Sequence, residues 1–432
     1  MQKTGANYIY MCKALGASLH NILSHVKSHP QAYPAIDLAY SSSEPLQEQV
    51  ILQLPRNGIR LRFDGPDQRL RLIEVLDFYK VSLVYKNQDV VKVKPQQQHE
   101  ASQSGPSFRH VYNRLFGPSY PGEYIPPRFP QSSHGTYVLS YPGISFLFPL
   151  QDAAWSDQCD FVALLSSTAA LPATTMAIFQ GSSWPEARGK IFTQQPPYPR
   201  FPALVGKSRE YVPDEVEEFR IYGAGKMEAT RRATPPTRIV LSKTTAQDLV
   251  AEFGPPDAVY RKNDRRISIH RASGGVPDPL RLNASPGQDI SLSEADLSSS
   301  NSVSDESDEE VVDSSSLPTE CFFNYFHHGF DAFISHPTTP GPAFPTSEMS
   351  DPLTPPQSSQ LTVTKIILHG NVPGSYPFNR HRRSRWMVQL NPLTHDYISS
   401  ETPYHEISQK LRHIWKGSYA RPEEERPMVL NR

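Results

Sequence analysis

The stretch GIRLRF, from Gly58 to Phe63, opens a run of alternating apolar residues, and two similar stretches follow along the chain. They are GISFLF from Gly143 and GFDAFI from Gly329. Each glycine follows another short run rich in β-branched and aromatic residues, a pattern typical of two strands joined by a turn. Glycine suits such a corner because it adopts backbone angles that other residues resist. Gly58, Gly143 and Gly329 are therefore predicted to be hairpin corners, with Asn57-Gly58 forming a two-residue turn.

A third apolar run follows each hairpin, and a segment with helical periodicity precedes each one. The third runs begin at Arg71, Met176 and Val363. Because one hairpin is marginal alone, a helix or another sheet must cover its apolar face. The sequence therefore predicts an α+β fold of about three repeated modules, each a helix followed by an antiparallel β-meander. The expected helices lie within residues 15–27, 107–118 and 243–256.

Polar and proline-rich segments interrupt these modules and set the expected domain boundaries. The segments 284–318, which is acidic and serine-rich, and 337–360, which is proline-rich, bury too little apolar surface to order themselves. Both are predicted to be disordered insertions within the third module. The expected units are a first module in 1–94, a linker in 95–105, a second module in 106–235, a third module in 236–283 and 319–390, and a C-terminal helix and tail in 391–432.

Composition limits the function in several ways. The 432 residues are 38% apolar and include 42 prolines, and 43 basic residues balance 44 acidic ones, which gives no support for a nucleic-acid partner. Three scattered cysteines favour reduced thiols in a cytoplasmic protein. The uncharged segment 161–179 contains a proline and several hydroxyl side chains, which favours buried strands or a loop over a membrane helix.

No pattern of residues points to catalysis, a cofactor or a metal. The sequence contains no Gly-x-Ser-x-Gly elbow, no His-Glu-x-x-His and no Cys-x-x-Cys. We therefore expect a protein that is not an enzyme.

One basic run, NRHRRSRW, concentrates positive charge beside an aromatic ring. Such a patch is suited to contact anionic lipid headgroups or a partner protein. Two alternatives are a solvated strand face and a docking site for the acidic insertion of the same chain. The residues of this expected contact are Arg380, Arg382, Arg383, Arg385 and Trp386.

Four hydroxyl side chains in the insertions match kinase motifs. Ser304 and Ser307 lie in an acidic stretch, and Thr339 and Thr354 each precede proline. Phosphorylation there would place regulated charge on a disordered loop.

Four blocks of the sequence, in order, match the pattern of one family: 46–86, FGPSYPGEY with GISFLF, TTAQDLVAEFGPPDAVYRK, and FFNYFHHGFDAFI with VTKIILHGNVPGSYPFNRHRR. Through these blocks the chain resembles the phagosome assembly factor family. The resemblance implies an α+β scaffold without enzymatic activity. Animal members act in autophagy: they pair with a WD-repeat propeller protein at the phagophore assembly site, where phosphoinositides are read. Older descriptions of the family instead imply Golgi-linked membrane trafficking.

The chain departs from the family pattern at both ends. The family has a strand where MQKTGANYIYMCK stands, and it continues beyond RPMVLNR into a last strand pair. Either the chain is truncated or this lineage has lost the last meander. In the second case we expect the helix at 403–416 to expose a partner-binding face. That face would contain Ile407, Leu411, Ile414 and Trp415.

Overall fold

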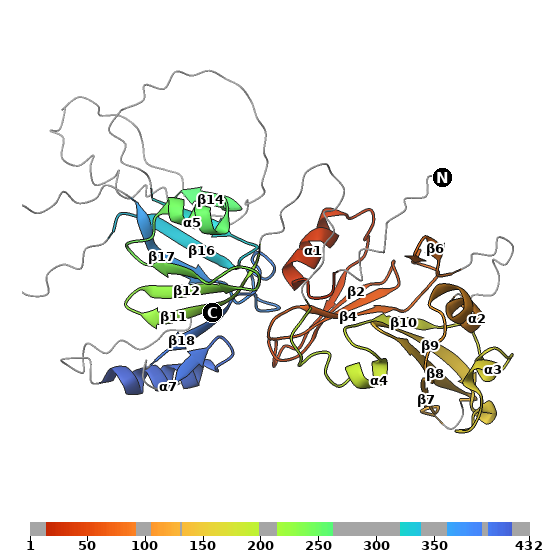
Figure 1. Ribbon diagram of the computed structural model, residues 1–432. Helices are drawn as coiled ribbons and strands as arrows, with labels where there is room; N and C mark the ends of the chain where they lie inside the picture. Colours follow the sequence, from red (N-terminus) through yellow and green to blue (C-terminus); the bar gives the residue numbers. More distant parts are fainter. Residues whose placement is uncertain are drawn as a thin grey trace, which may run out of the picture.

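The computed structural model describes residues 14–91, 105–129, 132–197, 214–261, 320–337, 361–390 and 396–416. Helices occur together with several antiparallel sheets, which confirms the α+β class. The elements form an N-terminal half, residues 14–197, and a C-terminal half, residues 214–416, which lie side by side (Figure 1). The expected linker and both insertions lie almost wholly outside the described residues.

The N-terminal half is built on one eight-stranded sheet with the order β1-β2-β3-β4-β10-β9-β8-β7. Two meanders, β1 to β4 and β7 to β10, meet where β10 pairs antiparallel with β4. The first two expected modules therefore share a single sheet. The strands are β1 (Asp37–Ala39), β2 (Val50–Leu54), β3 (Ile59–Phe63), β4 (Leu70–Val75), β7 (Glu123–Ile125), β8 (His134–Tyr141), β9 (Ile144–Gln151) and β10 (Thr175–Ile178).

Helices cover this sheet with the apolar faces that the periodicity predicts. The first, α1 (Leu19–Ser28), buries Leu19, Leu23 and Val26, and the Ser18 hydroxyl accepts a hydrogen bond from a first-turn amide. The second begins as α2 (Phe108–His110) and continues as one π-turn, η3 (Val111–Leu115). Both helices contribute to one continuous apolar core. Smaller elements are β5 (Val84–Tyr85), β6 (Gln88–Asp89), η4 (Asp152–Ala154), α3 (Phe161–Leu165) and α4 (Trp184–Ala187).

The C-terminal half contains two sheets. The third expected meander is a four-stranded sheet with the order β14-β15-β16-β17, and the other sheet has the order β13-β12-β11-β18-β19. In the latter, β11 runs parallel to β18, which lies far away in the sequence. The strands are β11 (Val216–Gly223), β12 (Lys226–Arg231), β13 (Thr237–Val240), β14 (Ala258–Arg261), β15 (Cys321–Tyr325), β16 (Phe330–Ser335), β17 (Thr362–Leu368), β18 (Arg385–Gln389) and β19 (Tyr397–Ser399).

These pairings correct one expected boundary. The sequence places residues 216–231 in the second module, but β11 and β12 pair with each other and with β13 and β18. These two strands therefore belong to the C-terminal half, because β11 forms hydrogen bonds with β12 and β18. The last strand of the second meander is instead β10, which pairs with β9.

A separate apolar core holds the C-terminal half together. The helix α5 (Ala246–Phe253) begins with a capping box formed by Thr245 and Asp248, and it buries Leu249 and Phe253. Phe253 contacts Phe330 of β16, which in turn contacts Phe219 of β11. The last helix is α7 (Tyr404–Trp415).

The three glycines occupy equivalent corners. Gly58, Gly143 and Gly329 have φ angles of 64°, 80° and 81°. In each case the carbonyl oxygen of the glycine accepts a hydrogen bond from the amide directly after the third strand, at Leu76, Phe179 and His369, over 2.8, 3.0 and 3.0 Å.

The expected two-residue turn lies at a different corner. β2 ends at Leu54 and β3 begins at Ile59, so four residues separate these strands. The tight two-residue connection is instead Pro142-Gly143, between Tyr141 and Ile144. Asn57 is buried and donates its side-chain amide to the Ala32 carbonyl, a contact that requires the wider loop.

The segment 161–179 contains the expected strand, β10, but it begins with the short helix α3, which the sequence did not predict. Within the described part of the chain, no helix combines the length and the apolar character that crossing a bilayer requires.

Candidate functional site

The basic run at 380–386 does not form a surface patch, which corrects the prediction. Arg382 and Arg383 are buried, Arg385 and Trp386 are half-buried, and only Arg380 is exposed. The physical reason is that the turn between β3 and β4 packs against this run. The arginines therefore lie in the junction, which we define as the contact between the 64–71 turn, residues 214–217 and residues 369–385.

Two of these arginines bind the N-terminal half directly. Arg383 donates from Nε to the Pro66 carbonyl over 2.7 Å, and Arg385 donates from Nη1 to Oδ1 of Asp67 over 2.7 Å. Both guanidinium groups also reach Oε1 of Glu401, at 2.8 and 3.2 Å. Asp67 from the N-terminal half and Glu401 from the C-terminal half thus offset the charges of Arg383 and Arg385.

Glu215 lies at the centre of the junction. It accepts hydrogen bonds from Asn21 Nδ2 over 2.6 Å and from Arg69 Nη1 over 2.5 Å, and Arg382 Nη1 lies 3.8 Å away. Burial alone would raise the pKa of Glu215, but the charges of Arg69 and Arg382 lower it to about 2. Glu215 is therefore a carboxylate that three side chains from both halves hold in its charged form.

A pair of neutral side chains forms a second link across the junction. Gln68 donates to the Asn371 carbonyl over 2.9 Å, and the Asn371 side chain donates back to Oε1 of Gln68 over 2.8 Å. Both residues are buried, with positive φ angles of 49° and 44°. Such angles are costly for residues other than glycine and persist where the surrounding contacts enforce them.

The junction is incompletely filled and leaves a cleft of about 700 Å³. We call it the junction cleft. Its walls come from both halves and are rich in charged and polar side chains, among which the arginines outnumber the carboxylates. The charged residues of the walls are Asp64, Asp67, Arg69, Arg71, Glu217, Glu218, Arg220, Arg232, Arg382, Arg383 and Arg385.

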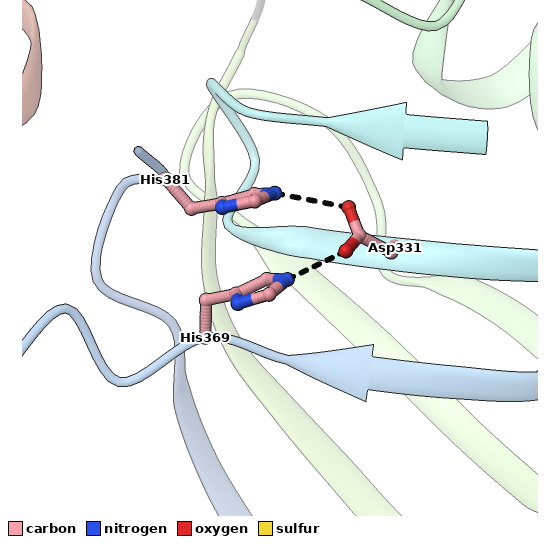
Figure 2. Close-up of side chains that lie close together, drawn as sticks. All are labelled: Asp331, His369 and His381. Carbon is pink, nitrogen blue, oxygen red and sulfur yellow. Dashed lines mark hydrogen bonds and ion pairs between the residues drawn. The ribbon is translucent and has the colours of Figure 1, made fainter. Parts of the chain in front are cut away.

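A second polar cluster lies in the third meander. Asp331 of β16 accepts hydrogen bonds from Nε2 of His369 and Nε2 of His381, over 2.8 and 3.0 Å (Figure 2). Burial would raise the pKa of Asp331, but these two hydrogen bonds hold it well below its usual range. Sequence reasoning missed this cluster, because the histidines lie 38 and 50 positions from Asp331 and no local spacing marks them.

The arrangement of the two imidazole rings suits hydrogen bonding to Asp331 better than binding a metal ion. Among the described residues, it is the one group of three side chains whose donor atoms lie close enough to share a metal ion. A tetrahedral zinc ion lies about 2.0–2.1 Å from imidazole nitrogen, near the plane of each ring. The two rings, however, are nearly parallel: their centroids lie 3.6 Å apart, and the angle between their planes is 12°. One ion therefore cannot lie near the planes of both rings. The cluster links Asp331 of β16 to His369, directly after β17, and to His381, which precedes β18.

The expected partner-binding face of α7 is only partly exposed, which corrects that prediction. Leu411 is buried, Ile407 is half-buried and Ile414 is 39% exposed. The helix lies beside β18 (Figure 1), and it lines a shared groove with residues of β19. The sheet therefore covers part of the face, while the Trp415 side chain lies outside what the structure describes.

The four predicted phosphorylation sites, Ser304, Ser307, Thr339 and Thr354, all lie outside the described residues.

Comparison with known proteins agrees with the resemblance of the sequence blocks. The family model described as phagosome assembly factor 1, PHAF1, matches residues 11–283 and 349–432. The chain belongs to this family. The PHAF1 description is consistent with a role related to autophagy.

Three PHAF1 proteins illustrate how widely the family extends. A Caenorhabditis elegans member is 22% identical over 97% of this chain and 82% of its own length. An Arabidopsis thaliana member is 24% identical over 87% of this chain and 72% of its own length. A Drosophila melanogaster member is 24% identical over 97% of this chain and 81% of its own length. No solved structure matches the chain.

Proposed function

We propose that this PHAF1 protein is a non-enzymatic adaptor in autophagy, which pairs with a WD-repeat propeller protein and acts with it at the phagophore assembly site. The observation that carries the proposal is the family match, which extends over both halves of the chain. The protein would act from the cytoplasm and reach the phagophore through its partner. No small-molecule chemistry is required of it.

An exposed side-chain pair beside the junction suits protein binding. Tyr376 is 86% exposed, and the guanidinium of Arg380 lies over its ring, 5.0 Å from the centroid. Tyrosine and arginine are among the residues that contribute most to binding energy at protein interfaces. An aromatic ring that is exposed in the free protein gains most from being covered by a partner. We place the partner contact at Tyr376 and Arg380.

Affinity capture followed by mass spectrometry tests this function in starved cells. The full-length chain is expected to recover a WD-repeat propeller protein. The double variant Tyr376→Ala and Arg380→Glu is expected to lose most of it, because the aromatic contact and the charge both change.

A matched control is Tyr120→Ala, which removes another highly exposed tyrosine from the N-terminal half. It should recover the propeller protein as the unmodified chain does. If the unmodified chain recovers no propeller protein, the adaptor function is wrong. If it does and the double variant recovers it equally well, the function stands and the contact lies elsewhere.

A further inference from the structure

The junction cleft is a site formed by segments that meet only in the folded protein. Its walls come from the 64–71 turn, residues 192–196, the strands β11 and β12, and residues 382–385. Tyr376 and Arg380 lie outside these walls, so the cleft is a different site from that pair. At about 700 Å³, the cleft is larger than one small ion requires.

The charge of the walls favours an anion. Seven arginines and four carboxylates line the cleft, an excess of three positive charges. Two further carboxylates, Glu215 and Glu401, pair with these arginines from outside the lining and reduce the excess to one. The lining carboxylates are themselves engaged: Asp64 with Arg71, Asp67 with Arg385, Glu217 with Arg232 and Glu218 with Arg220.

Arg382, together with Arg383, is the most enclosed of the arginines that the cleft shares with the junction core. Its side chain is 4% exposed, and it donates from Nε to the His327 carbonyl over 3.0 Å. Among the described residues, its Nη2 has no hydrogen-bond partner. Burial lowers the pKa of Arg382 to about 10 despite the opposing effect of Glu215. The Nη2 nitrogen is fully enclosed by protein, so Arg382 contributes a buried positive charge to the walls of the cleft rather than a free donor.

The form of the donors indicates which anion is suitable. Guanidinium groups offer paired N–H donors whose geometry matches phosphate, and several of them surround one cavity. The neutral wall residues Thr193, Gln195 and Thr230 are polar, which suits a hydroxylated ligand. We propose that the junction cleft binds a small organic anion carrying two or more phosphate groups, either free in solution or as the headgroup of a lipid.

Isothermal titration calorimetry on the full-length chain tests this proposal, with inositol hexakisphosphate as the probe. One molecule is expected to bind per chain, with an affinity that falls as salt is added. Inorganic phosphate should bind far more weakly because it reaches fewer of the arginines. Equal affinity for inorganic phosphate would overturn the assignment of a multiply phosphorylated ligand.

Two variants distinguish binding in the cleft from nonspecific attraction to positive charge on the protein. Arg220 lines the cleft with a side chain that is 50% exposed, so Arg220→Glu leaves the buried network intact and should weaken binding about tenfold. Arg188, outside the cleft, is 47% exposed and also paired with a glutamate, so Arg188→Glu is the matched control and should bind normally. No binding by the unmodified chain, or equal weakening in both variants, would refute the cleft as the site.

Arg382→Met removes one buried positive charge from the walls and should weaken binding if the variant folds. Flotation with phosphatidylcholine vesicles, with and without phosphatidylinositol 4,5-bisphosphate, then identifies the source of the ligand. Flotation that depends on the phosphoinositide and on Arg220 assigns a lipid headgroup. Binding of the soluble probe without flotation assigns a soluble phosphorylated ligand.

Discussion

The interior of the N-terminal half and the junction between the halves are stabilised by different forces. In the eight-stranded sheet, β4 and β10 pair edge to edge, and a continuous apolar core runs beneath both meanders. In the junction, buried arginines meet carboxylates and backbone carbonyls. Apolar burial depends little on pH or salt, whereas a buried ion pair loses its stability when one partner is neutralised or removed. The junction is therefore the part of the molecule that should respond most to charge.

The largest effect is expected from Glu215→Gln. Removing this charge leaves Arg69 and Arg382 buried beside a neutral amide, which should lower the free energy of unfolding by about 3–5 kcal/mol at neutral pH. The pKa of Glu215 is lowered to about 2, so its contribution is full above its ordinary value of 4.5 and is lost as the pH falls through 2. Chemical denaturation at several pH values measures both the loss and its disappearance in acid.

Glu218→Gln is the matched control, because Glu218 forms a more exposed ion pair with Arg220. Its cost should stay below about 1 kcal/mol. Equal losses in the two variants would mean that the junction gains nothing from burying its charges.

A smaller difference is expected between two hairpin corners. Gly143→Ala should cost about 1–2 kcal/mol, because its φ of 80° is unfavourable but the new Cβ would lie 3.4 Å from its nearest neighbour. Gly329→Ala has the same backbone strain, and its Cβ would lie 2.5 Å from the Arg382 carbonyl oxygen in the junction. We expect about 1–3 kcal/mol of additional destabilisation.

Thermal unfolding of these two single variants measures the difference. A similar loss in both would mean that the backbone at Arg382 moves readily to admit the new Cβ, so that the close approach at Gly329 adds nothing to the strain.

The last effect is absent at neutral pH and appears only in acid. His20 of α1 is buried at the junction, and burial lowers its pKa to about 4, helped by His327, His381 and Arg382. Since the folded pKa lies below the ordinary 6.5, stability is full above pH 6.5 and falls as the pH drops towards 4. At pH 5 this loss is about 2 kcal/mol.

The variant His20→Gln should not show this loss of about 2 kcal/mol of stability between pH 7 and pH 5. The pKa of His328, another buried histidine near the junction, is also lowered to about 4, so some acid sensitivity should remain. Unfolding at both pH values measures the change, and an unchanged pH profile in His20→Gln would show that the imidazole is already accessible to solvent.

Much of the local structure could be predicted from the sequence, because it depends on neighbouring residues. Alternation of apolar residues marked the strands of all three meanders, and the 3.6-residue periodicity marked α1 and α5. The backbone angles of the corners favour glycine, so the residue type together with the flanking apolar runs locates Gly58, Gly143 and Gly329 between their strands. These features require no information about distant parts of the chain.

What the tertiary structure alone decided is where distant segments meet. The pairing of β4 with β10 and of β11 with β18 depends on which sheet edges become neighbours, and local patterns carry no record of that. A run of arginines has the same sequence whether water or a neighbouring turn covers it, so the burial of Arg382 and Arg383 could not be read from NRHRRSRW. The sequence alone determined the parts of each module, and long-range packing determined the junction cleft, because a site between segments exists only once the chain has folded.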